Sequence, residues 1–425
     1  MRILVISNSE WDNSNSFGNT MTNLFNGTNL EFANIFCREG SPRTETCKYF
    51  LKISEKTILR KFQHAVKVEN NNEQKSQSVN KCISFAKVHR WTIFLWLREL
   101  IWETKRWKCK ELYDFLDEFN PDIILLMIYP YTYINKLAIH IKNKKHIPML
   151  SYVSDDDYTL KQFSLSPLFW INRLIQRRWV KKSINASEIL YVISKPQKEE
   201  YEKIFSVPCK ILTKSYDFKS VPVYKTEYNT PLKLLYAGNI GSNRWKSLAM
   251  LAKALKEINK DIIEATLDIY TATVITKKMY RSLMIEGASN LYGCVSAERI
   301  KELQKEADIL VYAEPIDLKN RLLARLSFST KIVDYLKACK PILAIGPDNI
   351  ASMEYLKDNN CAFVCKDLPE IKQKLQEIIS NRDFMGEIAL KAYMCGRANH
   401  EKSTMQNMLI DDLCACKEKY ESSTN

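Results

Sequence analysis

The sequence predicts an α/β protein made of two doubly wound domains, each with a parallel sheet between layers of helices. Three observations predict this class. The chain has 425 residues, more than a single hydrophobic core usually supports. Short β-rich runs alternate with longer helical stretches, as in βαβ units. A polar stretch at 216–230 separates two halves of similar size, and we interpret it as the interdomain linker.

The first domain is expected to cover residues 1–215. Its apolar, β-prone runs predict strands at 2–7, 30–36, 121–127, 147–153, 188–194 and 209–215. Helices are expected at 100–118, 135–144, 167–185 and 195–204. The clearest helix start is Ser166-Pro167, a capping serine before a first-turn proline. Residues 65–82 are rich in Asn, Gln, Lys and Ser and show no periodicity, so we expect a flexible insertion there.

The second domain is expected to cover residues 231–399. The same alternation predicts strands at 232–238, 265–271, 289–295, 307–313, 341–346 and 361–366. Helices are expected at 245–258, 275–285, 297–305, 329–338, 350–358 and 368–380.

Charge and composition narrow the function classes. The net charge of +14 favours an anionic partner, whether a nucleotide, a nucleic acid or an acidic membrane surface. The twelve cysteines show no zinc spacing and there are five histidines, so we expect reduced thiols and no metal site. The short apolar run within 1–7 is shorter than the core of a secretion signal, and no run reaches the roughly 18 apolar residues that span a bilayer. A cytoplasmic protein, soluble or peripheral to a membrane, is expected.

The most informative stretch is Ser327–Gly346, which predicts a short helix followed at once by a buried strand. Ser327, Ser329 and Thr330 are placed to cap the helix start, where free backbone N–H groups attract anions. Lys331 follows in the first turn, where the positive end of the helix dipole disfavours a cation. A phosphate bound nearby would explain a lysine at this position. Asp334, one turn later, is placed to accept hydrogen bonds from ribose hydroxyls. An ordinary αβ unit with a solvated lysine is the alternative.

This stretch resembles the donor-nucleotide motif of GT-B glycosyltransferases, particularly the bacterial family 4 type that builds surface polysaccharides. In the family pattern a glutamate stands where this chain has Asp334, and a glycine where it has Cys339. The resemblance implies two Rossmann-like doubly wound domains facing a cleft (GT-B), with the acceptor on the first and the nucleotide sugar on the second. It also implies that the last helix, at about 400–425, crosses back to the first domain.

Two glycine loops fit the same resemblance. Gly238 and Gly241 follow the first strand of the second domain, and Arg244 and Lys246 supply positive charge beside them. In the family such a loop grips the donor diphosphate; a plain βα turn with two surface cations is the alternative. Gly18, in the first βα loop of the chain, resembles the glycine that lies beside the donor.

The acidic residues fit the family less well. The family has an acidic pair separated by seven residues, but the position that pairs with Asp334 is Leu326. Glu314 and Asp317 have the wrong offset, and the same loop carries Lys319, Arg321 and Arg325, any of which could reach a phosphate.

Near the acceptor side, Asp155 and Asp156 follow the strand at 147–153, and we expect one of them to bind the acceptor hydroxyl or to stabilise the transition state. Solvated acids in a capped turn are the alternative, and no general base is assigned.

Two aromatic and basic segments suggest membrane contact. One runs from Arg90 to Trp107 and holds four of the eight tryptophans. The other begins at Pro167 and is expected to place Arg173, Arg177 and Lys181 on one stripe. A core helix and a solvated basic face are the alternatives, the first being favoured for the tryptophan segment.

The prediction is therefore a glycosyltransferase that moves a sugar, with retention, from a nucleotide-sugar donor to a glycan or polyprenyl-linked acceptor in capsule, O-antigen or related envelope polysaccharide synthesis. No cofactor, metal or nucleic acid is expected. A nucleotide-sugar epimerase of the same fold is one rival, and a non-catalytic basic protein that binds nucleic acid or membrane is another.

Overall fold

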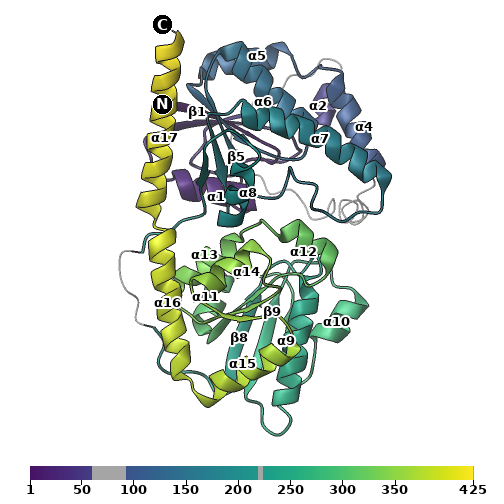
Figure 1. Ribbon diagram of the computed structural model, residues 1–425, viewed down its shortest axis with the longest axis vertical. Helices are drawn as coiled ribbons and strands as arrows, with labels where there is room; N and C mark the ends of the chain where they lie inside the picture. Colours follow the sequence, from purple (N-terminus) through teal and green to yellow (C-terminus); the bar gives the residue numbers. More distant parts are fainter. Residues whose placement is uncertain (60–91, 219–223, 425) are drawn as a thin grey trace.

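The computed structural model describes residues 1–59, 92–218 and 224–424. Two lobes are stacked along its long axis, and each holds a parallel sheet flanked by helices (Figure 1). The α/β class with two doubly wound domains is therefore confirmed. The insertion predicted at 65–82 lies outside the described residues.

The first sheet has seven strands in the order β3-β2-β1-β4-β5-β6-β7, and all neighbours are parallel. The strands are β1 (Arg2–Ser7), β2 (Glu31–Phe36), β3 (Tyr49–Lys52), β4 (Ile123–Met127), β5 (Met149–Val153), β6 (Ile189–Val192) and β7 (Cys209–Ile211). Val5 of β1 is in register with Asn34 and Leu125. Every residue of β4, β5 and β6 is buried, which is why these strands appear in the sequence as continuous apolar runs.

The helices of this domain are α1 (Ser16–Phe25), α2 (Glu55–Leu59), α4 (Thr92–Glu103), α5 (Lys110–Phe119), α6 (Thr132–Lys145), α7 (Pro167–Asn185) and α8 (Lys195–Glu202). The single helix predicted at 100–118 is wrong. The chain turns between α4 and α5, where Lys105 takes a positive φ of 58°. Trp102 and Trp107 are buried on either side of this turn, so for these two residues the core interpretation is confirmed.

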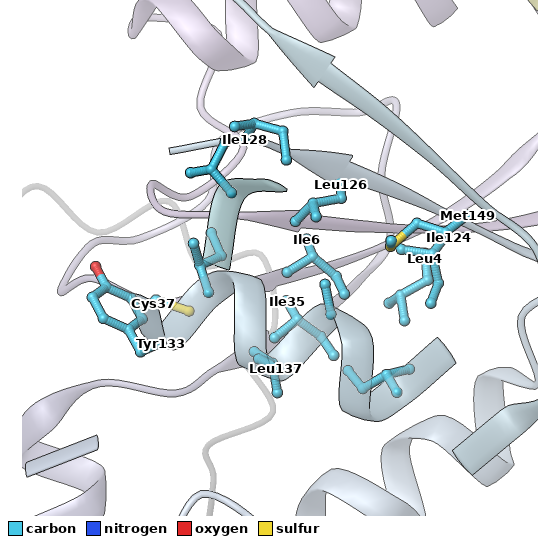
Figure 2. Packing of buried hydrophobic residues seen from close by; sticks show 14 of the residues in the cluster. Leu4, Ile6, Ile35, Cys37, Ile124, Leu126, Ile128, Tyr133, Leu137 and Met149 are labelled. Carbon is cyan, nitrogen blue, oxygen red and sulfur yellow. The ribbon is translucent and has the colours of Figure 1, made fainter. Parts of the chain in front are cut away.

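Helix α6 covers one face of the first sheet and closes its main core (Figure 2). Leu137 of α6 packs in the same cluster as Leu4 and Ile6 of β1 and Ile35 of β2, all with no exposed surface. The opposite face carries a second cluster, which includes Trp11 and residues of α1. Both faces of the sheet are thus covered, as a parallel sheet requires.

The second sheet has six parallel strands in the order β10-β9-β8-β11-β12-β13. They are β8 (Leu232–Ala237), β9 (Ala265–Tyr270), β10 (Ser289–Tyr292), β11 (Ile309–Ala313), β12 (Ile342–Ile345) and β13 (Phe363–Cys365). The helices are α9 (Arg244–Ile258), α10 (Lys277–Leu283), α11 (Ala297–Glu306), α12 (Leu318–Ala324), α13 (Thr330–Lys337), α14 (Ala351–Asp358) and α15 (Leu368–Ser380). Helix α12 occupies much of the stretch that the sequence suggested was a basic loop.

Two C-terminal helices join the lobes along one side of the molecule (Figure 1). Helix α16 (Asp383–Asn399) packs on the second domain, where its Ala392 contacts the cluster beneath α13. Helix α17 (Lys402–Thr424) packs on the first, with Leu409 and Leu413 fully buried. No helix in the described part of the chain is long and apolar enough to cross a bilayer.

The strand order places a topological switch point in each sheet. The first lies between β1 and β4 and the second between β8 and β11, because the chain moves outward in opposite directions from each of these pairs. Ligands of open parallel sheets bind at the carboxyl ends of the strands at such points. The candidate site is therefore sought in the loops after these four strands.

Candidate active site

A cavity of about 410 Å³ lies between the two domains, at the carboxyl end of the first sheet. The first domain contributes the loop after β1, the start of α1 and the loop after β5, and the second contributes residues 327–330. Hydroxyl and amide groups dominate its polar lining: Ser9, Asn15, Ser16, Thr20, Tyr129, Tyr152, Ser154, Ser327, Ser329 and Thr330. Among the described residues that line it, Asp155 alone carries a formal charge. Such a lining suits a neutral ligand rich in hydroxyl groups.

A second cavity, of about 720 Å³, lies over the carboxyl ends of β8, β9 and β10. It is lined by Gly238, Asn239, Gly241, Tyr270, Thr271, Ala272, Thr273, Val274, Cys294, Val295 and Ile300. The glycine loop of the second domain thus forms one wall of a large opening beside the second switch point.

Lys331 reaches from the first turn of α13 to the backbone of Gly238. A Cβ atom at Gly238 would fall 1.6 Å from the Lys331 Nζ atom, so a side chain at this position would displace the ammonium group. The Nζ atom also lies 4.9 Å from the centre of the Tyr236 ring. The lysine predicted from the motif and the glycine predicted from the loop therefore meet at one point.

The electrostatic surroundings of Lys331 disfavour its charge. Burial, and then the positive charge of Arg244, lower the pKa of Lys331 to about 8, although Glu314 and Asp334 act in the opposite direction. An anion bound here would offset both unfavourable effects. The protein thus holds a cation in a place that a bound phosphate would make more favourable.

Arg244, the first residue of α9, is held by a buried carboxylate. Its Nε and Nη2 atoms lie 3.2 and 3.0 Å from Oε2 of Glu314, which follows β11 and is 2% exposed. The Tyr312 hydroxyl donates a hydrogen bond to the other carboxylate oxygen. Burial alone would lower the pKa of Arg244, but Glu314, Tyr312 and Tyr236 together raise it. No role is predicted for Glu314 from the sequence, but in the structure it fixes the Arg244 guanidinium beside Lys331.

The rest of the glycine loop is ordered by its own polar groups. The Gly241 amide donates to Oδ1 of Asn239 at 2.6 Å, and Asn243 donates to Asp317, the N-cap residue of α12, at 3.0 Å. Lys246 lies in the first turn of α9, with Nζ 6.0 Å from the Trp245 ring centre. Its predicted contact with a diphosphate stays a prediction.

Asp334 is bound to the end of the first domain and to the start of the interdomain linker. Its Oδ1 atom accepts hydrogen bonds from Lys214 Nζ at 2.7 Å and from the Tyr216 hydroxyl. Its side chain is 31% exposed, whereas that of Lys214 is 8% exposed. Burial and then Asp334 raise the pKa of Tyr216. The predicted ribose contact therefore stays a prediction, and it would have to share this carboxylate with the linker.

The predicted helix-capping groups lie in the interdomain cavity. Ser329 is the N-cap residue of α13 but makes no capping hydrogen bond through its side chain, and Thr330 begins the helix. Gly18 is placed differently. Its amide donates to Asn15 at 2.7 Å, and a Cβ atom there would fall 2.1 Å from the carbonyl oxygen of Asp12. Gly18 thus lets α1 pack on the loop after β1, while Asn15, Ser16 and Phe17 line the cavity.

The two predicted acceptor-side aspartates have different surroundings. Asp155 lines the cavity and accepts a hydrogen bond of 2.6 Å from the Ser327 hydroxyl. Asp156 is 3% exposed and pairs with Arg325 across the domain boundary at 2.8 Å. Arg325 therefore contacts carboxylates, not the glycine loop. No cluster of three or more His, Cys, Asp or Glu side chains suited to a metal ion occurs among the described residues.

Comparison with known proteins supports the fold. No family model matches the chain, and no curated protein sequence does. Among solved structures, sucrose-phosphate synthase from Thermosynechococcus elongatus matches with a TM-score of 0.61 and 10% identity, over 98% of this chain and 99% of that one. HepE of Anabaena in complex with UDP-glucose matches with a TM-score of 0.60 and 13% identity, over 98% and 100%. At such identities the likeness shows the fold, which is GT-B.

Proposed function

We propose that the protein is a glycosyltransferase that moves a sugar from a nucleotide-sugar donor to a glycan or lipid-linked acceptor. One observation carries the proposal: Lys331 and Arg244 converge on the Gly238 loop at the switch point of the second domain. The cavity of about 720 Å³ beside this loop is the proposed place for the nucleoside. The cavity of about 410 Å³ between the domains, which is lined by hydroxyl and amide groups, is the proposed place for the sugar and the acceptor. The HepE structure, which contains UDP-glucose, supports a nucleotide-sugar donor.

The proposed chemistry uses these cations directly. As the bond between the anomeric carbon and the β-phosphate oxygen breaks, negative charge grows on the departing diphosphate. Arg244 is fixed before the reaction by Glu314, and Lys331 lies close to the backbone of Gly238, so both cations are in place to stabilise this charge with little reorganisation. No protein nucleophile or general base is assigned. Retention at the anomeric carbon, independence of metal ions, and a place in capsule, O-antigen or related envelope polysaccharide synthesis are proposed on the family resemblance.

Ligand binding and transfer test the proposal in sequence. The purified protein is first screened with UDP, GDP, CDP and dTDP and their sugars for an increase in melting temperature. The stabilising donor is then incubated with glycan and polyprenyl-linked acceptors. We expect Lys331→Ala to lower turnover by about two orders of magnitude. Isomerised donor without transfer would favour the epimerase. Salt-sensitive oligonucleotide binding without nucleotide binding would favour the non-catalytic basic protein.

We also propose that α7 docks on an anionic membrane at the cytoplasmic face, where a polyprenyl-linked acceptor would lie. The α7 apolar patch comprises exposed side chains on α7 and the loop before it: Phe163, Leu165, Leu168, Ile171, Leu174 and Ile175. Arg178, Lys181 and Lys182 are exposed further along the helix. The predicted basic stripe is wrong in one member, since Arg173 is 4% exposed and bonds to the main chain of Asp156 and Thr159.

Liposome flotation tests the docking. We expect the protein to float with anionic vesicles more than with neutral ones, because exposed basic and apolar groups act together at such a surface. Replacing Leu165 and Leu168 with serine should abolish flotation, whereas Leu323→Ser, at an exposed leucine of the second domain, should not. Failure to float on either lipid would discard the docking proposal without affecting sugar transfer.

A further inference from the structure

The segment Arg325–Ser327 belongs to the second domain by sequence but is embedded in the first. Leu326 is 2% exposed and lies in the main hydrophobic cluster of the first domain. Its carbonyl oxygen accepts a hydrogen bond of 2.7 Å from the Ser194 hydroxyl. Ser327 donates to Asp155 at 2.6 Å. Three successive residues of one domain thus contact the other.

Arg325 makes the strongest of these contacts. Its Nη1 atom lies 2.6 Å from Oε2 of Glu200, and its Nη2 atom lies 3.0 Å from Oε1 of Glu200 and 2.8 Å from Oδ2 of Asp156. The side chains of Arg325, Asp156 and Glu200 are 13%, 0% and 19% exposed. Paired, hydrogen-bonded charges this far removed from solvent interact more strongly than surface ion pairs.

The first domain holds its side of this contact independently of Arg325. The Thr159 amide donates to Oδ1 of Asp156 at 2.9 Å, and its hydroxyl donates to Oδ2. Arg173 donates to the carbonyl oxygens of Asp156 and Thr159 at 2.7 and 2.9 Å. The receiving carboxylate is therefore fixed by groups of its own domain, while the Arg173 guanidinium remains 3.9 Å from Oδ1 of Asp156.

This contact is directly connected to the proposed donor site. Ser329 and Thr330, which line the interdomain cavity, and Lys331, which reaches Gly238, follow Arg325 within six positions. The Arg325 carbonyl also accepts the amide of Ala351, the first residue of α14. Any separation of the two domains at this point must move the donor segment or break the ion pairs.

We propose that Arg325 is a positioning residue: its ion pairs with Asp156 and Glu200 fasten the segment Ser327–Lys331 to the first domain and hold the cleft in its catalytic arrangement. The catalytic part of this inference rests on the proposed function; the fastening itself does not. Arg325 thus pairs with Asp156 and Glu200 where the sequence suggested a phosphate, and Asp156 pairs with Arg325 where the sequence suggested the acceptor.

Four variants test it: Arg325→Met, Arg325→Lys, Glu200→Gln and, as a control, Arg299→Met. Arg299 is an exposed arginine of the second domain that pairs only with Glu302 and Glu306 of its own helix among the described residues. Amide hydrogen exchange follows the segments 155–159 and 325–330, X-ray scattering follows the radius of gyration, and titration with the stabilising nucleoside diphosphate follows donor-site affinity. Turnover is measured with the donor and acceptor found above.

We expect Arg325→Met to speed exchange in both segments at least tenfold and to increase the radius of gyration. The variant should lower kcat at least tenfold with less than a threefold change in donor KM. The reason is that Arg325 contacts Asp156 and Glu200 of the first domain and not the proposed donor pocket. Arg325→Lys should recover part of kcat. Glu200→Gln, which leaves Asp156 paired, should give a smaller effect in the same direction and serves if the methionine variant does not fold. Arg299→Met should match the wild type.

Unchanged exchange and kcat in Arg325→Met would overturn the inference. So would a tenfold loss of nucleotide affinity with the domains still closed, since this would make Arg325 a phosphate ligand. If the wild type transfers no sugar from any donor, the proposed function fails, yet the exchange and scattering results still decide whether Arg325 fastens the domains.

Discussion

Replacing Lys331 with methionine should stabilise the protein while removing its affinity for a diphosphate. The Lys331 ammonium group lies close to Gly238 and near Arg244, and burial together with the charge of Arg244 lowers its pKa from 10.5 to about 8. Each tenfold change in a protonation equilibrium corresponds to about 1.4 kcal/mol, so keeping the charge in the folded state costs about 3 kcal/mol. Loss of the contact with the Tyr236 ring offsets about 1–2 kcal/mol of the gain. The free energy of unfolding should therefore rise by about 1–2 kcal/mol at pH 7.

The pH dependence separates this cause from a general packing effect. Because the folded-state pKa lies below the unfolded one, the destabilisation is complete below about pH 8 and fades as the pH rises toward 10.5. Urea denaturation at pH 7 and pH 10 should therefore show a stability gain that shrinks at the higher pH. Lys337→Met, at an exposed position of the same helix, is the control and should show no such change. A methionine variant that is less stable than the wild type by the same amount at both pH values would refute the reasoning.

Three further changes have distinct expected outcomes. Glu314→Gln removes the charge that fixes Arg244, and calorimetric titration should show about a tenfold loss of diphosphate affinity; unchanged affinity would contradict this role. Asp308→Ala should lower the free energy of unfolding by about 3 kcal/mol at pH 7, since this buried carboxylate accepts hydrogen bonds from Lys225 and Asn229. Burial raises the pKa of Asp308, but these partners lower it overall. The difference in the free energy of unfolding between the wild type and the variant should therefore vanish as the pH falls through that lowered pKa. A difference that stays constant down to pH 2 would count against the argument. Leu413→Ala should cost about 2–5 kcal/mol and speed proteolysis of α17, and an unchanged digestion pattern would show that α17 is held elsewhere.

The parts of the fold that were predictable are those with local signals. Helix α7 spans Pro167–Asn185, as predicted, because a capping position and a first-turn proline mark its start. The central strands were recognisable because burial on both faces requires uninterrupted apolar runs. By contrast, the turn at 104–109 between α4 and α5 depends on tertiary packing. Trp102 stacks on Tyr133 at 4.4 Å, a contact that no local pattern encodes.

The loops of the candidate site could be predicted from the sequence, but the partners of its charged groups could not. A glycine loop and a polar helix start have recognisable sequences, and the structure places the two residues predicted from them, Gly238 and Lys331, side by side. The partners of the charged groups lie far away in the chain. Arg325 and Asp156 are 169 positions apart, and Lys214 and Asp334 are 120 apart. A charged residue in a loop gives no local sign of whether it will meet a phosphate or a distant carboxylate, so Arg325 was grouped with the phosphate candidates.

The two positions where the chain departs from the acidic pair of the resembled family have a common explanation in the structure. At the first, Leu326 is turned into the core of the first domain, where a carboxylate would be buried without a partner. At the second, one carboxylate oxygen of Asp334 accepts hydrogen bonds from Lys214 of the first domain and from Tyr216 of the linker. Leu326 and Asp334, at the two ends of the segment that contains Lys331, therefore both contact residues outside the second domain. An aspartate side chain is shorter than that of a glutamate, which suits the contact of Asp334 with Lys214. Leu326, next to Arg325, packs in the core of the first domain. In this chain, then, the segment that would bind the donor also joins the domains, so a separation of the domains must either break these contacts or move the segment.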